Sequence, residues 1–178
     1  MKIRLARDLQ PDSIVDGEGI RTVIWTQGCI HNCPFCHNPE THSFDGGILV
    51  DISRIKEVLK EIKGQTGITF SGGDPMAQPK ECMEIAKYAK EIGLNVWCYT
   101  GYTYEKLLTM GEDYTNFLKY IDVLVDGPFL IKEKSFDVKF RGSKNQRLID
   151  VKKTFNNNEV VLYDEEVKQE TKKRRMYI

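Results

Sequence analysis

The sequence predicts an α/β fold, a partial (open) β/α barrel with mainly parallel strands. Segments rich in β-branched and aromatic residues alternate along the chain with segments whose apolar residues recur at helical spacing. Strands separated by helices of this size form right-handed βαβ units, and such units build a parallel sheet. About five strands of this kind are expected, which is too few to close an eight-stranded barrel.

The first strand and the first helix have clear ends. Residues 21–27 are rich in β-branched and aromatic side chains, and this strand stops at Gly28. The helix that follows covers 53–63, with Ser53 able to cap its start and Gly64 able to end it. Its apolar residues share one helical face: Ile55, Val58, Leu59 and Ile62.

The remaining elements continue the alternation. The second strand, 67–71, runs into a glycine-rich turn, and the second helix, 79–92, ends at Gly93. The apolar face of this helix contains Cys82, Ile85, Ala86 and Ala89. Further strands are expected at 94–100, 121–126 and 147–151, with helical stretches at 104–110 and 116–120.

The composition changes beyond Val151. The stretch 152–158 is polar, and 172–175 contains only lysine and arginine. We therefore expect one domain over 1–151 and a polar, basic C-terminal appendage over 152–178, in which 160–163 can add a short edge strand.

The charge balance excludes some partners. Lysine plus arginine and aspartate plus glutamate number 26 each among the 178 residues. A neutral chain gives no electrostatic reason to bind nucleic acid or an anionic membrane. No apolar stretch is long enough to cross a bilayer, and the N-terminal residues mix charges with apolar side chains, unlike a signal peptide. The chain is expected in the cytoplasm, where thiols stay reduced.

Four separate motifs are expected at one rim of the sheet. Cys29, Gly72, Thr100 and Asp126 each fall at or just after the end of a predicted strand. Ligands of open α/β sheets bind at the carboxyl ends of the strands. The sequence therefore predicts that these residues surround a common site.

Three cysteines have a spacing typical of metal ligands. Cys29, Cys33 and Cys36 form a C-x3-C-x2-C pattern, whereas Cys82 and Cys98 lie in apolar segments and are expected in the core. Three thiolates can hold three irons of a cubane cluster and leave the fourth iron open. The alternatives are an electron-carrier cluster, or a zinc site completed by a neighbouring histidine.

The turn after the second strand offers a second ligand-binding element. In Ser71-Gly72-Gly73-Asp74-Pro75 the glycines let the backbone approach a ligand closely. The Asp74 carboxylate can accept hydrogen bonds from an ammonium group. Taken alone, the turn is more typical of a tight strand-to-helix connection without a ligand.

Together, the cysteine pattern and the glycine-rich turn resemble the radical S-adenosylmethionine (SAM) superfamily. Four more stretches, in the family's order, resemble the glycyl-radical-enzyme activases of the anaerobic (class III) ribonucleoside-triphosphate reductases: 16–22, 97–102, 123–129 and 141–147. The resemblance covers residues 14 to 151, and it implies a partial barrel of the radical SAM type. The tail from Lys152 departs from the short family pattern.

The resemblance also implies cofactors and site residues. Cys29, Cys33 and Cys36 are expected to hold a 4Fe–4S cluster, with SAM bound at its open iron. The residues expected to contact SAM are Phe35, Cys36, His37, Gly72, Gly73, Asp74, Thr100 and Asp126, the last two near the SAM carboxylate or a cation. The roles of Arg141 and Asn145 stay open.

The implied reaction is the installation of a glycyl radical on a partner protein. Reduced flavodoxin or ferredoxin supplies an electron, and SAM is cleaved to methionine and a 5′-deoxyadenosyl radical. That radical takes hydrogen from a glycine of the large subunit of anaerobic ribonucleoside-triphosphate reductase. Because the cofactors do the chemistry, no general acid or base is expected. The alternative is a radical SAM enzyme acting on a small molecule, such as 7-carboxy-7-deazaguanine synthase.

Overall fold

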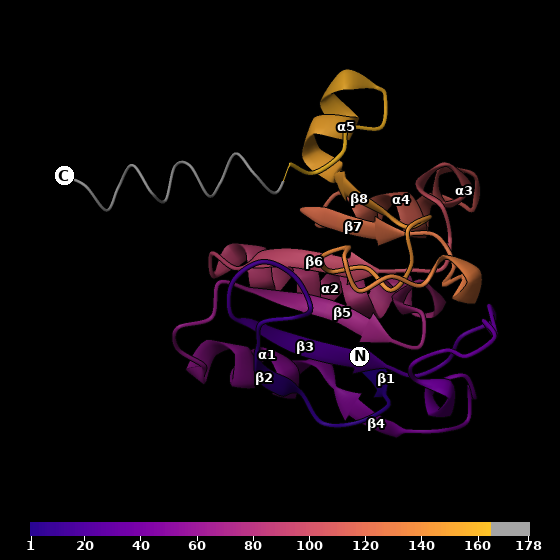
Figure 1. Ribbon diagram of the computed structural model, residues 1–178. Coiled ribbons are helices and arrows are strands. Elements are labelled where there is room, and N and C mark those ends of the chain that lie inside the picture. The colour runs from indigo at the N-terminus through magenta and orange to yellow at the C-terminus, as the bar shows by residue number, and fades with distance from the viewer. Residues whose placement is uncertain (165–178) are drawn as a thin grey trace.

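The computed structural model describes residues 1–164, which contain one mixed sheet (Figure 1). Its strands are β1 (Lys2–Leu5), β2 (Gln10–Ser13), β3 (Arg21–Thr26), β4 (Ile48–Asp51), β5 (Gly67–Gly72), β6 (Asn95–Tyr99), β7 (Val123–Asp126) and β8 (Arg147–Asp150). Neighbouring strands follow the order β4-β1-β3-β5-β6-β7-β8, and β2 pairs with β3.

The centre of the sheet is parallel and its margins are antiparallel. Strands β3, β5, β6 and β7 run in the same direction. Strand β8 is antiparallel to β7, and β1 is antiparallel to both β3 and β4. Because β4 and β8 lie at opposite ends of this order, the sheet is not closed. The predicted open α/β fold with a parallel centre is confirmed.

Helices cover one face of this sheet. They are α1 (Ile52–Glu61), α2 (Pro79–Glu91), α3 (Tyr104–Thr109), α4 (Glu112–Leu118) and α5 (Val151–Asn157). Figure 1 shows α1 and α2 behind the strands. In the described part of the chain, no helix is long and apolar enough to span a membrane.

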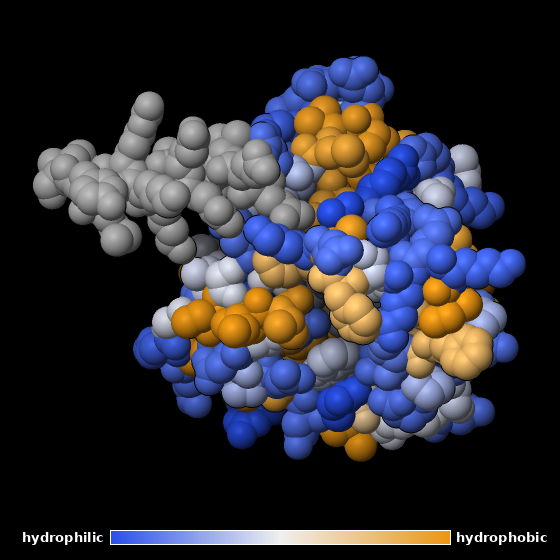
Figure 2. All heavy atoms as spheres, in the orientation of Figure 1, coloured by the Kyte–Doolittle hydropathy of each residue, from blue (hydrophilic) through white to orange (hydrophobic). Residues whose placement is uncertain are grey.

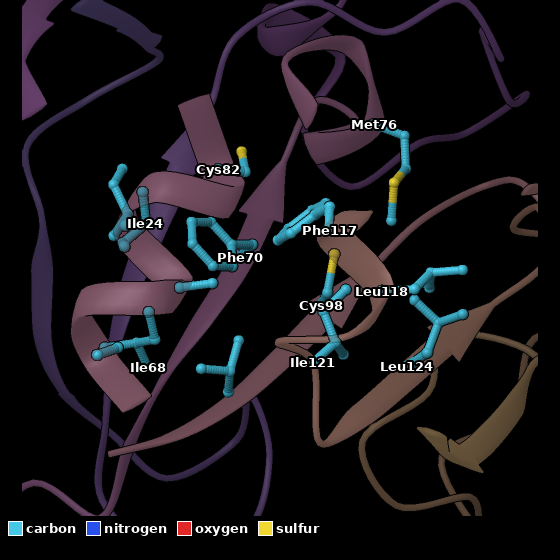
Figure 3. Close-up of a cluster of buried hydrophobic side chains, with 14 of the residues drawn as sticks. Ile24, Ile68, Phe70, Met76, Cys82, Cys98, Phe117, Leu118, Ile121 and Leu124 are labelled. Carbon is cyan, nitrogen blue, oxygen red and sulfur yellow. The ribbon is translucent and has the colours of Figure 1, made fainter. Parts of the chain in front are cut away.

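The core lies between the strands and the helices, and Figure 3 shows its centre. Alternate residues of a strand point to opposite faces, so Ile68 and Phe70 of β5 both face the helices. The ring of Phe117 from α4 meets that of Phe70 edge-on, with the ring centroids 5.5 Å apart. The thiols Cys82 and Cys98 are buried in this core, as the sequence predicts.

The other face of the sheet, which is turned toward the viewer in Figures 1 and 2, carries a second, smaller cluster. It is formed by Trp97, Val123, Val125 and Leu148. The guanidinium of Arg21 lies 5.3 Å from the centroid of the Trp97 ring, and burial lowers the pKa of Arg21 to about 10. The Arg21 Nε donates to Thr69 Oγ1 at 2.7 Å, so this buried cation fastens β3 to β5.

Several elements differ from the sequence-based expectation. Strands β1, β2 and β4 were not predicted, because each has four residues and takes its conformation from the strand beside it. Helix α4 begins at Glu112, earlier than expected. The expected edge strand at 160–163 is reduced to an isolated bridge between Leu162 and Ile149.

The polar stretch after Val151 begins with a helix that was not predicted. Its two buried residues, Val151 and Thr154, are too few to give a clear apolar periodicity in the sequence. The Phe155 ring lies edge-on to Tyr104, with the ring centroids 6.2 Å apart, so α5 packs against α3. The basic stretch 172–175 lies outside the described residues, and the boundary at 151 stays a prediction.

Candidate functional site

A cavity of about 330 Å³ opens at the carboxyl ends of the parallel strands. One wall is the loop after β3, which contributes the three clustered cysteines with His31, His37 and His42. Residues 71–74, at the end of β5 and after it, and residues 99–101, at the end of β6 and after it, form the next part of the wall. Gly127, Phe129, Gly142 and Gln146 form a further part of the wall, and Asp16 and Trp25 complete the lining.

The loop after β3 turns its three thiols toward this cavity. Cys29, Cys33 and Cys36 are free and half-buried, and all three line the cavity. Asn32 and Phe35 have positive φ angles of 45° and 60°, which bend the chain between the cysteines. Such angles are uncommon for residues with a side chain and often mark functional loops.

The donor set fits a 4Fe–4S cluster held by three thiolates. Thiolates are the ligands of such clusters, and each binds a separate iron, so thiols spread around one cavity suit a cubane. In the part of the chain that the structure describes, no group of three or more His, Cys, Asp or Glu side chains is arranged to hold a single metal ion.

The first cysteine is held by the backbone around it. The backbone amide of Cys29, the first cysteine of the loop, donates to the His42 carbonyl at 3.1 Å. Burial raises the pKa of the Cys29 thiol, a hydrogen bond from the His31 amide lowers it, and the Asp74 charge raises it again. A bound iron favours the thiolate form, so cluster binding has to displace this proton.

The glycine-rich turn lies directly against the start of the cysteine loop. The Gly73 amide donates to Thr26 O and the Asp74 amide donates to Gly28 O, both at 2.8 Å. A Cβ atom at Gly73 would lie 2.4 Å from the Gly28 carbonyl oxygen, so no side chain fits there. Gly72 has a φ of 100°, a conformation that favours glycine. The turn therefore needs both glycines.

Asp74 joins the ends of three strands. Its side chain is buried, and Oδ1 accepts from the Met76 amide at 2.9 Å. Its Oδ2 accepts from the Thr100 hydroxyl at 2.9 Å and the Gly101 amide at 3.0 Å, and it lies 2.7 Å from His31 Nε2. These protein donors explain its burial, and a direct contact of this carboxylate with a cofactor stays a prediction.

Asp126 is also engaged within the protein. The Arg147 Nε donates to Asp126 Oδ1 at 2.9 Å, and the Tyr104 amide donates to Oδ2 at 2.8 Å. Asp126 is buried and is not among the residues that line the cavity. Arg147 is therefore the cation that pairs with Asp126 at the end of β7. A contact of Asp126 with SAM or with a bound cation stays a prediction.

The segments 123–129 and 141–147 bind each other. The Asn145 amide nitrogen donates to the Pro128 carbonyl at 2.8 Å, and Gln146 Nε2 donates to the Gly127 carbonyl at 3.1 Å. Gln146 Oε1 accepts from the Gly142 amide at 2.8 Å. This network fixes the wall that contains Phe129, whose ring centroid lies 4.8 Å from that of His37.

The structure brings most of the predicted site residues together. Those that line the cavity are Cys29, Cys33, Cys36, His37, Gly72, Gly73, Asp74 and Thr100. Phe35 is 78% exposed and does not line it. Sequence reasoning missed Tyr99, Phe129 and Gln146, although each lies in a stretch that carries the family resemblance.

Comparisons with known proteins agree with this geometry. The model of the 4Fe-4S single cluster domain family (Fer4_12) matches residues 15–149. The anaerobic ribonucleoside-triphosphate reductase-activating protein of Haemophilus influenzae is 31% identical over an alignment 145 residues long, which covers 76% of this chain and 91% of that protein. The chain belongs to this family of activating proteins. Membership confirms the radical SAM resemblance, with a 4Fe–4S cluster and SAM as cofactors.

Two further proteins resemble the chain over a more limited part. The pyruvate formate-lyase-activating enzyme of Clostridium pasteurianum is 37% identical over 63% of this chain and 47% of its own length. The crystal structure of QueE from Escherichia coli superposes with a TM-score of 0.50 over 57% of this chain and 54% of that chain, at 13% identity. The likeness to QueE concerns the fold alone.

Proposed function

We propose that this protein activates an anaerobic ribonucleoside-triphosphate reductase by generating a glycyl radical on it. The observation that carries the proposal is the cavity in which three thiols and a glycine-rich turn face the same space. Similarity to the activating protein of Haemophilus influenzae over most of both chains supports the choice of target.

Residues of three strand ends would hold the cofactors. Cys29, Cys33 and Cys36 would bind the 4Fe–4S cluster, because they are the free thiols on the cavity wall. Gly72 and Gly73 would bring their backbone to the SAM amino group. When bound, the reduced cluster supplies the electron for cleavage of SAM, which yields methionine and, after hydrogen is taken from the glycine, 5′-deoxyadenosine.

The part of the cavity wall between β7 and β8 would shield the reaction. Phe129 and Gly142 come from the two segments that bind each other, and both line the cavity. Their network of amide hydrogen bonds gives this wall a fixed conformation. A fixed wall keeps water away from the reacting atoms, and the open sheet leaves a side through which a glycine-bearing loop of the partner can enter.

The remaining partners follow from the same proposal. Reduced flavodoxin or ferredoxin would be the electron donor, and the enzyme would work in the cytoplasm. The balanced charge of 26 basic and 26 acidic residues supports a protein partner over nucleic acid or membrane.

An anaerobic radical-transfer assay tests the proposal. The cluster-loaded protein is incubated with SAM, dithionite and the large subunit of the anaerobic reductase from the same organism. We expect a doublet electron paramagnetic resonance signal on the reductase and one 5′-deoxyadenosine per radical. The doublet has to disappear when the radical-bearing glycine is replaced by alanine.

Two outcomes favour other functions. If 5′-deoxyadenosine forms without a doublet on either the reductase or pyruvate formate-lyase, the result favours an enzyme that acts on a small molecule, as 7-carboxy-7-deazaguanine synthase does. If the doublet appears on pyruvate formate-lyase and not on the reductase, the target is that enzyme, in keeping with the partial similarity to the Clostridium pasteurianum activator.

A further inference from the structure

His31 lies inside the cysteine loop but contacts the ends of two other strands. It stands between Cys29 and Cys33, and its ring lines the cavity. Its Nε2 lies 2.7 Å from Oδ2 of Asp74 in the glycine-rich turn. Since the carboxylate accepts hydrogen bonds only, the histidine Nε2–H is the donor. This contact joins two residues 43 positions apart in the sequence.

The partner of His31 is itself held rigidly. The side chain of Asp74 is 3% exposed, and that of His31 is 15% exposed. The other donors to Oδ2, the Thr100 hydroxyl and the Gly101 amide, come from the segment after β6. The Asp74 oxygen therefore holds the loop after β3 and the loop after β6 at fixed positions relative to the turn after β5.

The chain after β6 is shaped to receive the histidine ring. A Cβ atom at Gly101 would lie 2.4 Å from His31 Cδ2, so any side chain at that position would displace the ring. Gly101 has no positive φ, so this glycine is required for space and not for backbone conformation. The ring of Tyr102 meets the His31 ring edge-on, with the ring centroids 4.4 Å apart.

We propose that His31 is a positioning residue, which locks the cysteine loop to the glycine-rich turn in the arrangement that SAM requires. The inference rests on the proposed function, because it takes this cavity to be the SAM site. A SAM molecule has to meet the open iron and the Gly72–Gly73 backbone at once. The distance between those two elements therefore decides how well SAM binds, and His31 is the side chain of the cysteine loop that bonds to the turn.

The expected defect is in SAM binding and not in cluster assembly. His31 is not needed as a cluster ligand, since three thiols line the cavity without it. Without the imidazole, the cysteine loop keeps its sulfur donors but loses its charge-assisted bond to the turn. A loop displaced by a fraction of an ångström can still bind irons, whereas a ligand that bridges loop and turn loses affinity.

The test compares four variants of the full-length, anaerobically loaded protein: His31→Ala, His31→Gln, Gly101→Ala and Lys90→Ala. Iron is counted per chain, and the dissociation constant of SAM is measured from the change that SAM causes in the spectrum of the reduced cluster. No reductase is present, so the result does not depend on the identity of the partner. Lys90→Ala is the matched control, because it removes an ion pair to Asp122, 2.6 Å long, away from the cavity.

We expect His31→Ala to keep the iron content of the wild type and to bind SAM about tenfold more weakly. His31→Gln should recover most of the affinity, because its amide nitrogen can reach the position of Nε2. Gly101→Ala should weaken SAM binding from the other side of the contact, and Lys90→Ala should bind SAM like the wild type.

Two results would overturn the proposal. One is a His31→Ala protein with full iron and an unchanged SAM dissociation constant. The other is iron loss in His31→Ala that His31→Gln does not restore, with Gly101→Ala binding SAM normally, since that pattern assigns His31 to cluster retention. Two results for the wild type would instead contradict the proposed function. One is a reduced cluster whose spectrum does not change when SAM is added, and the other is the absence of a radical on any glycine.

Discussion

Arg147 binds Asp126 across two antiparallel strands, at the point where β7 gives way to the loop that forms one wall of the cavity. The two residues are directly paired in the register of β7 and β8, and Arg147 Nε lies 2.9 Å from Asp126 Oδ1. The other guanidinium nitrogens reach Glu105 of α3 at 3.0 and 2.8 Å. One arginine thus connects the last strand, the cavity loop and a covering helix.

Replacing this arginine by an uncharged side chain should destabilise the fold. In Arg147→Met the buried Asp126 carboxylate keeps the Tyr104 amide but loses its charged partner. We expect the free energy of unfolding to fall by about 2–3 kcal/mol, measured by urea denaturation under anaerobic conditions. Glu105→Gln is the control, because it leaves Asp126 paired and disturbs an exposed contact worth about 1 kcal/mol or less. Equal losses in both variants would contradict this account.

Alanine at any of the three clustered cysteines should abolish stable cluster binding. Cys29→Ala, Cys33→Ala and Cys36→Ala each leave two thiols on the cavity wall, which cannot hold three irons. Iron and sulfide analysis after anaerobic loading should give about four of each in the wild type and much less in these variants. Cys82→Ala is the control, since this thiol is buried in the core. Full iron in a clustered-cysteine variant would exclude that cysteine as a ligand.

A methyl group at Gly73 should damage SAM binding more than overall stability. The new Cβ atom would lie 2.4 Å from the Gly28 carbonyl oxygen, so the turn has to move away from the cysteine loop. We expect Gly73→Ala to raise the SAM dissociation constant by about tenfold or more, as a displaced binding turn does. Gly93→Ala provides the comparison: its Cβ meets no atom within 4 Å, and its positive φ leads to a stability loss without a SAM defect. A Gly73→Ala protein with normal SAM affinity would remove this turn from the site.

The parallel centre of the sheet could be predicted because its sequence is locally consistent. Strand β3 is fully buried and uninterrupted in its β-forming residues, and α2 keeps an apolar face between Pro79 and Gly93. Parallel strands place their carboxyl ends at one edge, so Cys29, Gly72 and Thr100 were expected to meet there. Their meeting follows from topology and needs no knowledge of side-chain conformations.

The contacts that organise the site could not be predicted in the same way. The pairing of Asp126 with Arg147 depends on the antiparallel register of β7 and β8, which the sequence of neither strand determines alone. The contact of His31 with Asp74 depends on two loops whose conformations are set by hydrogen bonds to Thr26 and Gly28. Strand β2, with the sequence QPDS, has no strand pattern and forms by pairing with β3.

Stability at alkaline pH should depend on Tyr99, whose phenol lies between the sheet and the segment before Gly142. Its hydroxyl donates to the Phe140 carbonyl at 2.8 Å, and burial raises the pKa of Tyr99 well above its usual value. A tyrosine in the unfolded chain ionises near pH 10. The unfolded protein therefore releases this proton at a lower pH than the folded protein does. The contribution of Tyr99 to stability is complete below about pH 10 and declines as the pH rises further.

In Tyr99→Phe the free energy of unfolding should be about 1 kcal/mol lower at pH 8, because the hydrogen bond to the Phe140 carbonyl is missing, but it should fall less steeply above pH 10. Urea denaturation of both proteins between pH 8 and 11, followed by circular dichroism, measures this difference, and two parallel curves would show that the buried phenol does not govern the alkaline limit.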